Sequence, residues 1–389
     1  MTSDLWAQFF EAVLEEMPRA QQLRWQIHQS PQVSGNESET RDLILKELGN
    51  PTWEPVAETG GVVRIGPADG PAIGVRAELD ALPIVEDTGA EFSSTNGAMH
   101  ACGHDIHMAA AFAIARAAIR TPLPFAILLV LQPREEAYPS GARDISESEI
   151  LERHDVHSMF GAHVHPRIPA GGIAVGAGAV NAASDEFRIM IRGSGGHAAY
   201  PHQADDSIVA MAAVIGAAQT VVSRTLDPMR PAVLSFGNLS AGSVANVLPS
   251  ESFASGTIRT MDATDRETAY LTLTRIVSEV AEAYNCSGEV ELIQGEPVLY
   301  NDPRVANAVS VALQEFGATV VEPMRSCGAD DFSYYTEKFP GLMMFVGTNK
   351  SPDDPPLHSS RFLPEDASIY QMAMAYAVSL RATYEQLVK

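Results

Sequence analysis

The sequence predicts a two-domain α/β protein, in which an α/β domain is interrupted by an inserted ferredoxin-like α+β domain. The 389 residues exceed what one hydrophobic core normally supports, so two domains are expected. The first half alternates apolar runs of strand length with helical segments, as α/β sheets do. Residues 184–294 instead follow the order β-α-β-β-α-β, which is that of the ferredoxin-like split unit. The predicted segments are 1–183 and 295–389 for the α/β domain and 184–294 for the inserted domain.

Composition limits the classes of partner. The chain has 26 Lys and Arg against 49 Asp and Glu, a formal net charge of -23, so nucleic acid and anionic membranes are not expected as partners. Residues 1–20 mix acids with apolar residues, which indicates an amphipathic helix and not a signal peptide, and no apolar run is expected to reach membrane-spanning length. The 3 cysteines form no disulfide framework, which favours a cytoplasmic location.

Three expected strands of the first segment lead to polar residues. They are strand 72–79 with Asp80, strand 125–131 with Glu135 and Glu136, and strand 159–164 with His163. Strand ends are where open α/β sheets build their sites, so we expect these side chains to converge. The other elements expected in this segment are helices 1–20, 38–48 and 103–119 and strand 61–65.

The rest of the chain supplies the inserted domain and completes the first one. The inserted domain is expected to contain strand 187–192, helix 205–224, strands 232–236 and 252–260, helix 265–284 and strand 289–293. The α/β domain then resumes with helix 301–316, strand 341–347 and helix 365–388.

The stretch from Met99 to His107 indicates a metal site. Cys102 and His104 are separated by one small residue, so both side chains can face one cation, and thiolate with imidazole suits zinc-like metals. A two-metal hydrolytic site needs four to six ligands and one carboxylate free to take a proton from water. The chain offers the ligands Cys102, His104, Glu136, His163 and His358. Glu135 is left as the free carboxylate, because neighbouring side chains of an extended segment point in opposite directions.

Nine segments, in order along the chain, resemble one family. They are residues 76–83, 99–105, 132–136, 161–163, 195–202, 246–249, 256–260, 328–332 and 357–359. They are similar to the metal-dependent amidohydrolases typified by hippurate hydrolase, the bacterial N-acyl-amino-acid amidohydrolases and the plant indole-acetyl-amino-acid hydrolases, and more distantly to the carboxypeptidase G-like metallopeptidases. The resemblance implies a metallopeptidase-like catalytic domain, with the inserted domain serving as lid and dimerisation domain.

The resemblance also implies roles for single residues. Cys102 matches the bridging metal ligand, and the other positions that match ligands are His104, Glu136, His163 and His358. Glu135 matches the general base, and Asp80 matches an acid that orients a ligand. His197 matches a histidine that reaches the substrate carbonyl, often in the neighbouring subunit. Asn246 and Arg259 match positions that hold the substrate carbonyl and carboxylate.

The expected protein is a cytoplasmic amidohydrolase with two divalent metal ions per subunit, which cleaves the amide bond of a small N-acyl amino acid. Zinc suits the thiolate, although manganese, cobalt or nickel also fit such ligands. A homodimer or higher homo-oligomer through the inserted domain is expected. Asp330 departs from the glutamate usual in the family, which leaves the shape of the pocket open.

Three alternatives stay open at the level of the sequence. A dipeptidase or carboxypeptidase would use the same site on a peptide bond. A non-catalytic ligand-binding relative would keep the fold without turnover. A cysteine hydrolase would use Cys102 as nucleophile, although a Cys and a His two positions apart rarely align for that purpose. His100 and His107 are expected to pack or to hydrogen-bond behind the ligands and not to bind metal.

Overall fold

The computed structural model describes residues 2–387, and the chain divides into two compact units. The first, here called the α/β unit, comprises Met1–Gly178, Tyr300–Met324 and Asp331–Lys389, and the second, the inserted unit, comprises Ala179–Leu299 and Arg325–Asp330. The predicted insertion, 184–294, lies within the second unit. The stretch Arg325–Asp330 differs from the prediction, because backbone hydrogen bonds join Ser326 to Val180 and Ala182 of the inserted unit.

A mixed sheet forms the centre of the α/β unit. Among the described residues it has eight strands in the order β1 (Glu54–Val56), β2 (Gly60–Ile65), β4 (Ala126–Gln132), β3 (Ala72–Glu78), β5 (Val156–Pro169), β16 (Gly341–Asn349), β6 (Gly172–Ala174) and β15 (Thr319–Val321). Strands β4, β3, β5 and β16 run parallel, so their carboxyl ends meet at one edge. β3 and β4 are buried along their whole length, which explains why they lack a polar alternation.

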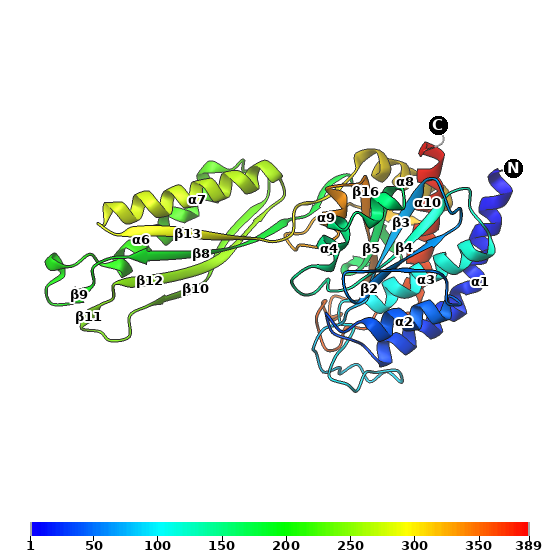
Figure 1. Ribbon diagram of the computed structural model, residues 1–389, viewed down its shortest axis with the longest axis horizontal. Coiled ribbons are helices and arrows are strands. Elements are labelled where there is room, and N and C mark those ends of the chain that lie inside the picture. Colours follow the sequence, from blue (N-terminus) through cyan, green and yellow to red (C-terminus); the bar gives the residue numbers. More distant parts are fainter. Residues whose placement is uncertain (1, 388–389) are drawn as a thin grey trace. The chain divides into compact units, whose positions relative to one another are not determined.

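Helices cover both faces of this sheet (Figure 1). The helices of the unit are α1 (Thr2–Gln29), α2 (Ser38–Glu47), α3 (His104–Arg120), α4 (Gly141–Glu147), α5 (Ile150–Arg153), α8 (Pro303–Phe316), α9 (Ser333–Thr336) and α10 (Ala367–Leu387). Helices α1, α3 and α10 pack against one another, and α4 packs against α9. The alanines of α3 are almost all buried, which lets this helix lie close to the sheet and to its neighbours.

The largest difference from a predicted helix boundary concerns the first helix. The first helix does not end at residue 20 but continues through Pro18 to Gln29. A proline removes one helical hydrogen bond, yet Leu23 and Ile27 on the continuing turns are buried in the core, and that packing keeps the chain helical. The last helix was predicted to reach Val388, a residue that lies outside the described residues.

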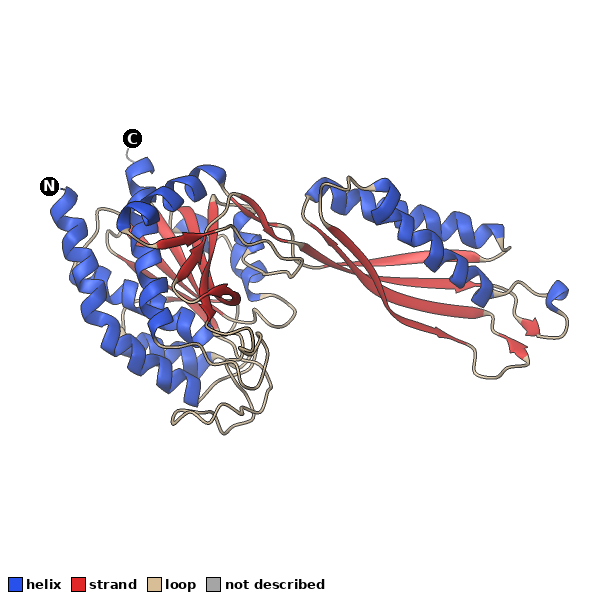
Figure 2. Ribbon diagram, turned by 180° about the vertical axis from the view of Figure 1, so that it is seen from behind, coloured by secondary structure: helices blue, strands red, loops and turns tan. Residues whose placement is uncertain are grey.

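The inserted unit has the predicted ferredoxin-like order (Figure 2). Its main elements are β8 (Ala183–Arg192), α6 (Ser207–Thr220), β10 (Ala232–Ala241), β12 (Glu251–Thr260), α7 (Ala263–Ala283) and β13 (Ser287–Gln294). The four strands form an antiparallel sheet in the order β10-β12-β8-β13, and both helices pack on one face of it. Smaller pieces are β7 (Gly178–Asn181), β9 (Gly196–His197), a 3-10 turn at Pro201–Gln203, a π-helical turn at Val221–Thr225 and β11 (Val247–Leu248). The chain passes back to the α/β unit within β14 (Leu299–Asn301).

The expectation that no apolar run reaches membrane-spanning length is wrong for one segment. Ser207–Thr225 has 19 residues with a mean hydropathy of 1.5, enough to cross a membrane by length and composition alone. A helix that packs on a sheet passes the same test, and Met211, Val214 and Ala218 of this segment lie in the core of the inserted unit. Only 28% of the most apolar part of the segment is buried, so packing in the core accounts for one face of the helix, while Ile208 and Val209 are exposed on another.

Candidate metal centre

The predicted ligands come from loops and strand ends at one edge of the sheet. Cys102 and His104 flank Gly103, the residue before α3, which has a φ of 86°. A Cβ atom on Gly103 would lie 2.4 Å from the Cγ2 atom of Val164 in β5. A glycine is therefore required here both for the backbone conformation and for the close approach. This approach brings the Cys102 segment against the strand that carries His163.

The structure brings all five predicted ligands together. The Sγ atom of Cys102 lies 3.3 Å from Nε2 of His163, and one ligand atom each of Cys102, His104 and Glu136 lie within 4.8 Å of one another. The Nε2 atom of His358 lies 3.2 Å from Oε1 of Glu136. The loop of His358 is tied to the same place, because its backbone N–H donates to the carbonyl of Ala101.

Two of the histidine rings are oriented by backbone carbonyls. Nδ1 of His104 lies 2.9 Å from the carbonyl oxygen of Asp80, and Nδ1 of His163 lies 2.6 Å from that of Val164. A proton on each Nδ1 leaves the Nε2 lone pair for a metal, the usual arrangement of histidine ligands. The Nε2 atom of His104 is buried and makes no hydrogen bond. An unpaired buried nitrogen beside a thiol and carboxylates fits a site built for zinc-like cations.

Asp80 does not belong to the ligand set but contacts two of its members, His104 and Glu136. Its Oδ2 atom accepts a hydrogen bond of 2.7 Å from Ser34 and one of 2.9 Å from the backbone N–H of Glu136, and its Oδ1 lies 3.6 Å from Nδ1 of His104. Burial alone would raise the pKa of Asp80, but the hydrogen bonds and the charge of His104 outweigh it, so the pKa lies below its usual value. The carboxylate therefore stays ionised and orients both His104 and the Glu136 loop.

The electrostatics of Cys102 and His104 tie metal binding to proton release. Burial, followed by the charge of Glu136, raises the pKa of the Cys102 thiol well above its usual value. Burial lowers the pKa of His104, but Asp80 and Cys102 outweigh it and raise this pKa well above the usual value. Both groups thus hold protons that a cation must displace. A raised thiol pKa also argues against the cysteine-hydrolase alternative, because nucleophilic cysteines have lowered pKa values.

Glu135 lies at the rim of this cluster. Its Oε2 atom is 3.7 Å from Nε2 of His104, and its side chain is 12% exposed, so it reaches both the ligands and solvent. The position suits a carboxylate that exchanges a proton with water.

The other three predicted residues lie in the inserted unit. His197 is exposed on β9 and pairs with Val247 of β11, and the carbonyl of Asn246 accepts a hydrogen bond from the neighbouring strand end. Arg259 lies near the far end of β12, beside Ser184. It is eight positions along the extended strand from Glu251, the first residue of β12, a span of roughly 26 Å at about 3.3 Å per residue. Within one chain, His197 and Asn246 are neighbours, whereas Arg259 is distant from both.

Two buried residues next to the ligands were not predicted as site residues. One ligand atom each of Glu78, His104, His107 and His163 lie within 4.8 Å of one another. The expectation that His107 makes hydrogen bonds behind the ligands is confirmed by its contacts with Glu78 and Val164. His100 is fully buried, and burial lowers its pKa to about 3, so the ring is neutral. For Glu78 the available signal was its place in strand 72–79, two residues before Asp80.

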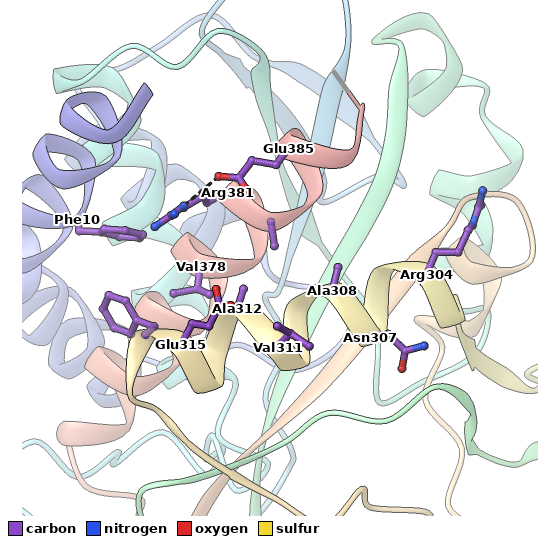
Figure 3. A pocket seen from close by; sticks show the side chains of 12 residues that line it. Phe10, Arg304, Asn307, Ala308, Val311, Ala312, Glu315, Val378, Arg381 and Glu385 are labelled. Carbon is purple, nitrogen blue, oxygen red and sulfur yellow. Dashed lines mark hydrogen bonds and ion pairs between the residues drawn. The ribbon is translucent and has the colours of Figure 1, made fainter. Parts of the chain in front are cut away.

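A groove on the α/β unit lies away from these ligands. Figure 3 shows a groove of about 760 Å³ between helices α1, α8 and α10, lined by apolar side chains such as Phe10 and Val311 and by Arg304, Glu315 and Arg381. None of the predicted site residues lines it. The volume of a groove therefore does not identify the functional site, which is identified instead by the convergence of metal-binding side chains.

The α/β sheet, the ligand cluster at its edge and the inserted ferredoxin-like unit together define a metal-dependent hydrolase of the dinuclear class. Residues 74–381 match the family described as Peptidase family M20/M25/M40, and the chain belongs to this family. It is 34% identical over 357 residues to the N-acetyldiaminopimelate deacetylase of Shouchella clausii, covering 89% of this chain and 93% of that protein. It is 36% identical over 335 residues to the N-acetylcysteine deacetylase of Bacillus subtilis, covering 84% and 87%.

A solved structure agrees with this assignment. The Bacillus subtilis YXEP protein, described as a dinuclear metal-binding peptidase from the M20 family, superposes with a TM-score of 0.81 at 30% identity, covering 94% of this chain and 98% of that one. The α/β class with an inserted lid domain is confirmed.

Proposed function

We propose that the protein is a two-metal amidohydrolase that removes the acyl group from small N-acyl amino acids. The observation that carries the proposal is the convergence of Cys102, His104, His163, Glu136 and His358 at one sheet edge, with Glu135 at the rim. Deacetylases among the relatives support the reaction type and the substrate class.

Each site residue has a separate role in the proposed hydrolysis of the amide bond. Two divalent ions, when held by these ligands, would polarise an amide carbonyl and acidify water. Glu135 then takes a proton from the attacking water and delivers it to the nitrogen of the leaving amino acid. Asp80 keeps His104 and the Glu136 loop in place during these transfers. His197, once beside the substrate, would donate a hydrogen bond to the carbonyl oxygen as negative charge develops on it.

We propose zinc as the native metal, because a thiolate and three imidazoles are among the ligands. Manganese, cobalt and nickel are the alternatives that these ligand types accept. The free state of Cys102, Cys286 and Cys327 supports a cytoplasmic location.

A homodimer through the inserted unit would complete the site. Arg259 lies in β12 of the four-stranded sheet and His197 in the small β11-β9 sheet at the other end of the inserted unit, so one small substrate cannot contact both residues of one chain. In a symmetric dimer, Arg259 could act together with His197 of the partner subunit. Two observations support the inserted unit as the interface: β10 and β13 are edge strands, and the outer face of α6 exposes Ile208 (42%) and Val209 (47%).

The direct test is metal removal combined with a substrate panel. Protein stripped with a chelator is expected to lose activity and to regain it when zinc, manganese, cobalt or nickel is added back. The reconstituted enzyme is then assayed by amine release on N-acetyl, N-benzoyl and indole-acetyl amino acids and on dipeptides. Full activity of the stripped protein contradicts the metal mechanism. A clear preference for dipeptides contradicts the deacylase assignment, and tight binding of substrate analogues without turnover favours a non-catalytic relative.

Arg259 is expected to select substrates with a free carboxylate. Arg259→Lys keeps the charge but loses the two-pronged hydrogen bond, and Arg259→Ala loses both. Charged hydrogen bonds contribute about 1.5–3 kcal/mol, so Arg259→Ala should lower kcat/KM by roughly 10- to 150-fold, mainly through KM. Arg188→Ala, an exposed arginine on β8 that pairs with Glu291, is the matched control. Equal losses on an acyl amino acid and on its amide, which lacks the carboxylate, would contradict this role.

A further inference from the structure

Behind the ligand cluster, three buried side chains form a continuous hydrogen-bonded chain. Arg76 donates from Nη1 to Oε1 of Glu78 over 2.7 Å, and Nδ1 of His107 lies 3.2 Å from the same oxygen. Nε2 of His107 accepts the backbone N–H of Val164 over 3.0 Å. All three side chains are at most 1% exposed. The chain of contacts thus ends on the peptide that follows the ligand His163.

The far end of this chain is anchored in the core. Nη2 of Arg76 donates to Oδ1 of Asp331 over 2.6 Å, and its Nε donates to Oε1 of Gln132 over 3.0 Å. Asp331 accepts two further hydrogen bonds from Gln132. Strands β3, β4 and β5 and the helix α3 are therefore connected by side chains as well as by their packing, and Glu78 has little freedom to move.

The group of Glu78 and three histidines is not a further metal site. Glu78 already pairs with the guanidinium of Arg76, whose positive charge opposes a cation. Both ring nitrogens of His107 are engaged, one with Glu78 and one with the Val164 N–H. A cation bound there would have to break the Arg76–Glu78 pair and leave a buried N–H unpaired, and each change is costly.

We propose that His107 and Glu78 are positioning residues for His163. The inference rests on the proposed function, because it assigns His163 the role of a metal ligand. Both backbone polar groups of Val164 are engaged: its N–H donates to His107, and its carbonyl oxygen accepts from Nδ1 of His163. Glu78 keeps the proton of His107 on Nδ1, so that Nε2 remains an acceptor. The carbonyl then fixes the His163 ring with Nε2 toward Cys102.

Two substitutions of His107 separate positioning from packing. His107→Gln places an amide oxygen near the position of Nε2, so the Val164 N–H keeps an acceptor. His107→Asn places a donor toward Glu78 but leaves that N–H unpaired. Loss of a residue that orients a metal ligand typically weakens metal binding by about 10- to 100-fold. We expect this loss for one of the two ions in His107→Asn and a clearly smaller loss in His107→Gln. Glu78→Gln should lie between them.

The experiment measures metal affinity and ligand geometry in the full-length protein. Each ion is titrated by chelator competition, the visible spectrum of the Co²⁺ form reports on coordination, and thermal unfolding of the chelated protein reports on packing. His165→Gln, a half-buried histidine on the same strand that accepts the Arg167 N–H, is the matched control and should bind two ions as the wild type does. With metal in excess, kcat of His107→Asn should recover while KM stays unchanged.

Two results would overturn the positioning role. One is wild-type affinity for both ions in His107→Asn. The other is an equal loss of affinity in His107→Gln and His107→Asn that follows an equal loss of thermal stability, which would mean packing alone. Metal titration of the wild type distinguishes failure of the proposed function from failure of the positioning role. A wild type that binds no metal refutes the proposed function. A wild type that binds two ions, together with variants whose metal affinity is unchanged, refutes only the role of His107.

Discussion

Glu135→Gln is expected to lower kcat by about 10²- to 10⁴-fold while both metal ions stay bound. The amide has nearly the same shape as the carboxylate but cannot take a proton from water at neutral pH. The metal should stay because Glu135 is the carboxylate left over from the five ligands and lies at the rim of their cluster, with Oε2 3.7 Å from Nε2 of His104. Steady-state kinetics and metal analysis of the same preparation measure both effects.

The neighbouring carboxylate provides the control. Glu136→Gln changes a predicted ligand, so it should lower metal content as well as activity, and added metal should restore part of the activity. The same addition should not restore Glu135→Gln. If Glu135→Gln retains more than about a tenth of the wild-type kcat, or loses a metal ion, its assignment as general base is wrong.

Much of the fold follows from local patterns in the sequence. The strands that carry the site are fully buried apolar runs, and the turn at Gly103 lies between two residues whose side chains suit a metal. The antiparallel order of the inserted unit follows from strand and helix segments that are each regular on their own. These features need only neighbouring residues, so the sequence contains enough information to predict them.

What escaped prediction depends on contacts between distant positions. Glu78 appears in the sequence as one more residue of a strand, and its importance depends on Arg76 being held by Asp331, which is 255 positions away. The continuation of α1 beyond Pro18 depends on packing that no local rule contains. Arg325–Asp330 belongs with the inserted unit because of backbone pairing with the Val180 region. A single sequence without aligned relatives does not reveal such pairs.

The three histidines of the ligand stretch illustrate the same point. The ligand stretch contains His100, His104 and His107, and spacing alone treats them alike. The structure separates them by their partners: His104 keeps an unpaired Nε2, His107 uses both nitrogens, and His100 is a neutral buried ring. Whether Nε2 already has a hydrogen-bond partner therefore distinguishes the metal ligand His104 from the positioning residue His107, although both are histidines.

Arg24→Met is expected to destabilise the α/β unit by about 3–5 kcal/mol, because it leaves a buried carboxylate without its main partner. Arg24 is 1% exposed and donates over 2.8 Å to Asp105 in the first turn of α3, over 2.5 Å to Asp366 just before α10, and over 2.7 Å to the carbonyl of Pro364. It therefore joins three helices beside the ligand His104. Urea unfolding of chelated protein, followed by circular dichroism, measures the loss without a contribution from metal binding.

The pH dependence of that loss identifies its cause. Burial raises the pKa of Asp105, but the charges of Arg24 and then His28 outweigh burial and hold this pKa well below its usual value. The ionised carboxylate therefore stabilises the folded wild type above about pH 4, and this contribution is lost as the pH falls through the pKa of the folded state. Burial lowers the pKa of His28, yet Asp105 and Glu86 raise it above 6.5. Charged His28 can partly replace Arg24 below that pH.

The loss in free energy of unfolding caused by Arg24→Met should therefore be smaller at about pH 5 than at about pH 8. Arg143→Met, which removes an exposed pair with Glu147 on α4, should cost only about 0.3–0.5 kcal/mol at either pH. Asp105→Asn in the Arg24→Met background should recover part of the loss, because the unpaired charge is then gone. A deficit that is independent of pH and unchanged by Asp105→Asn would mean that Arg24 stabilises the unit by packing and not by its charge.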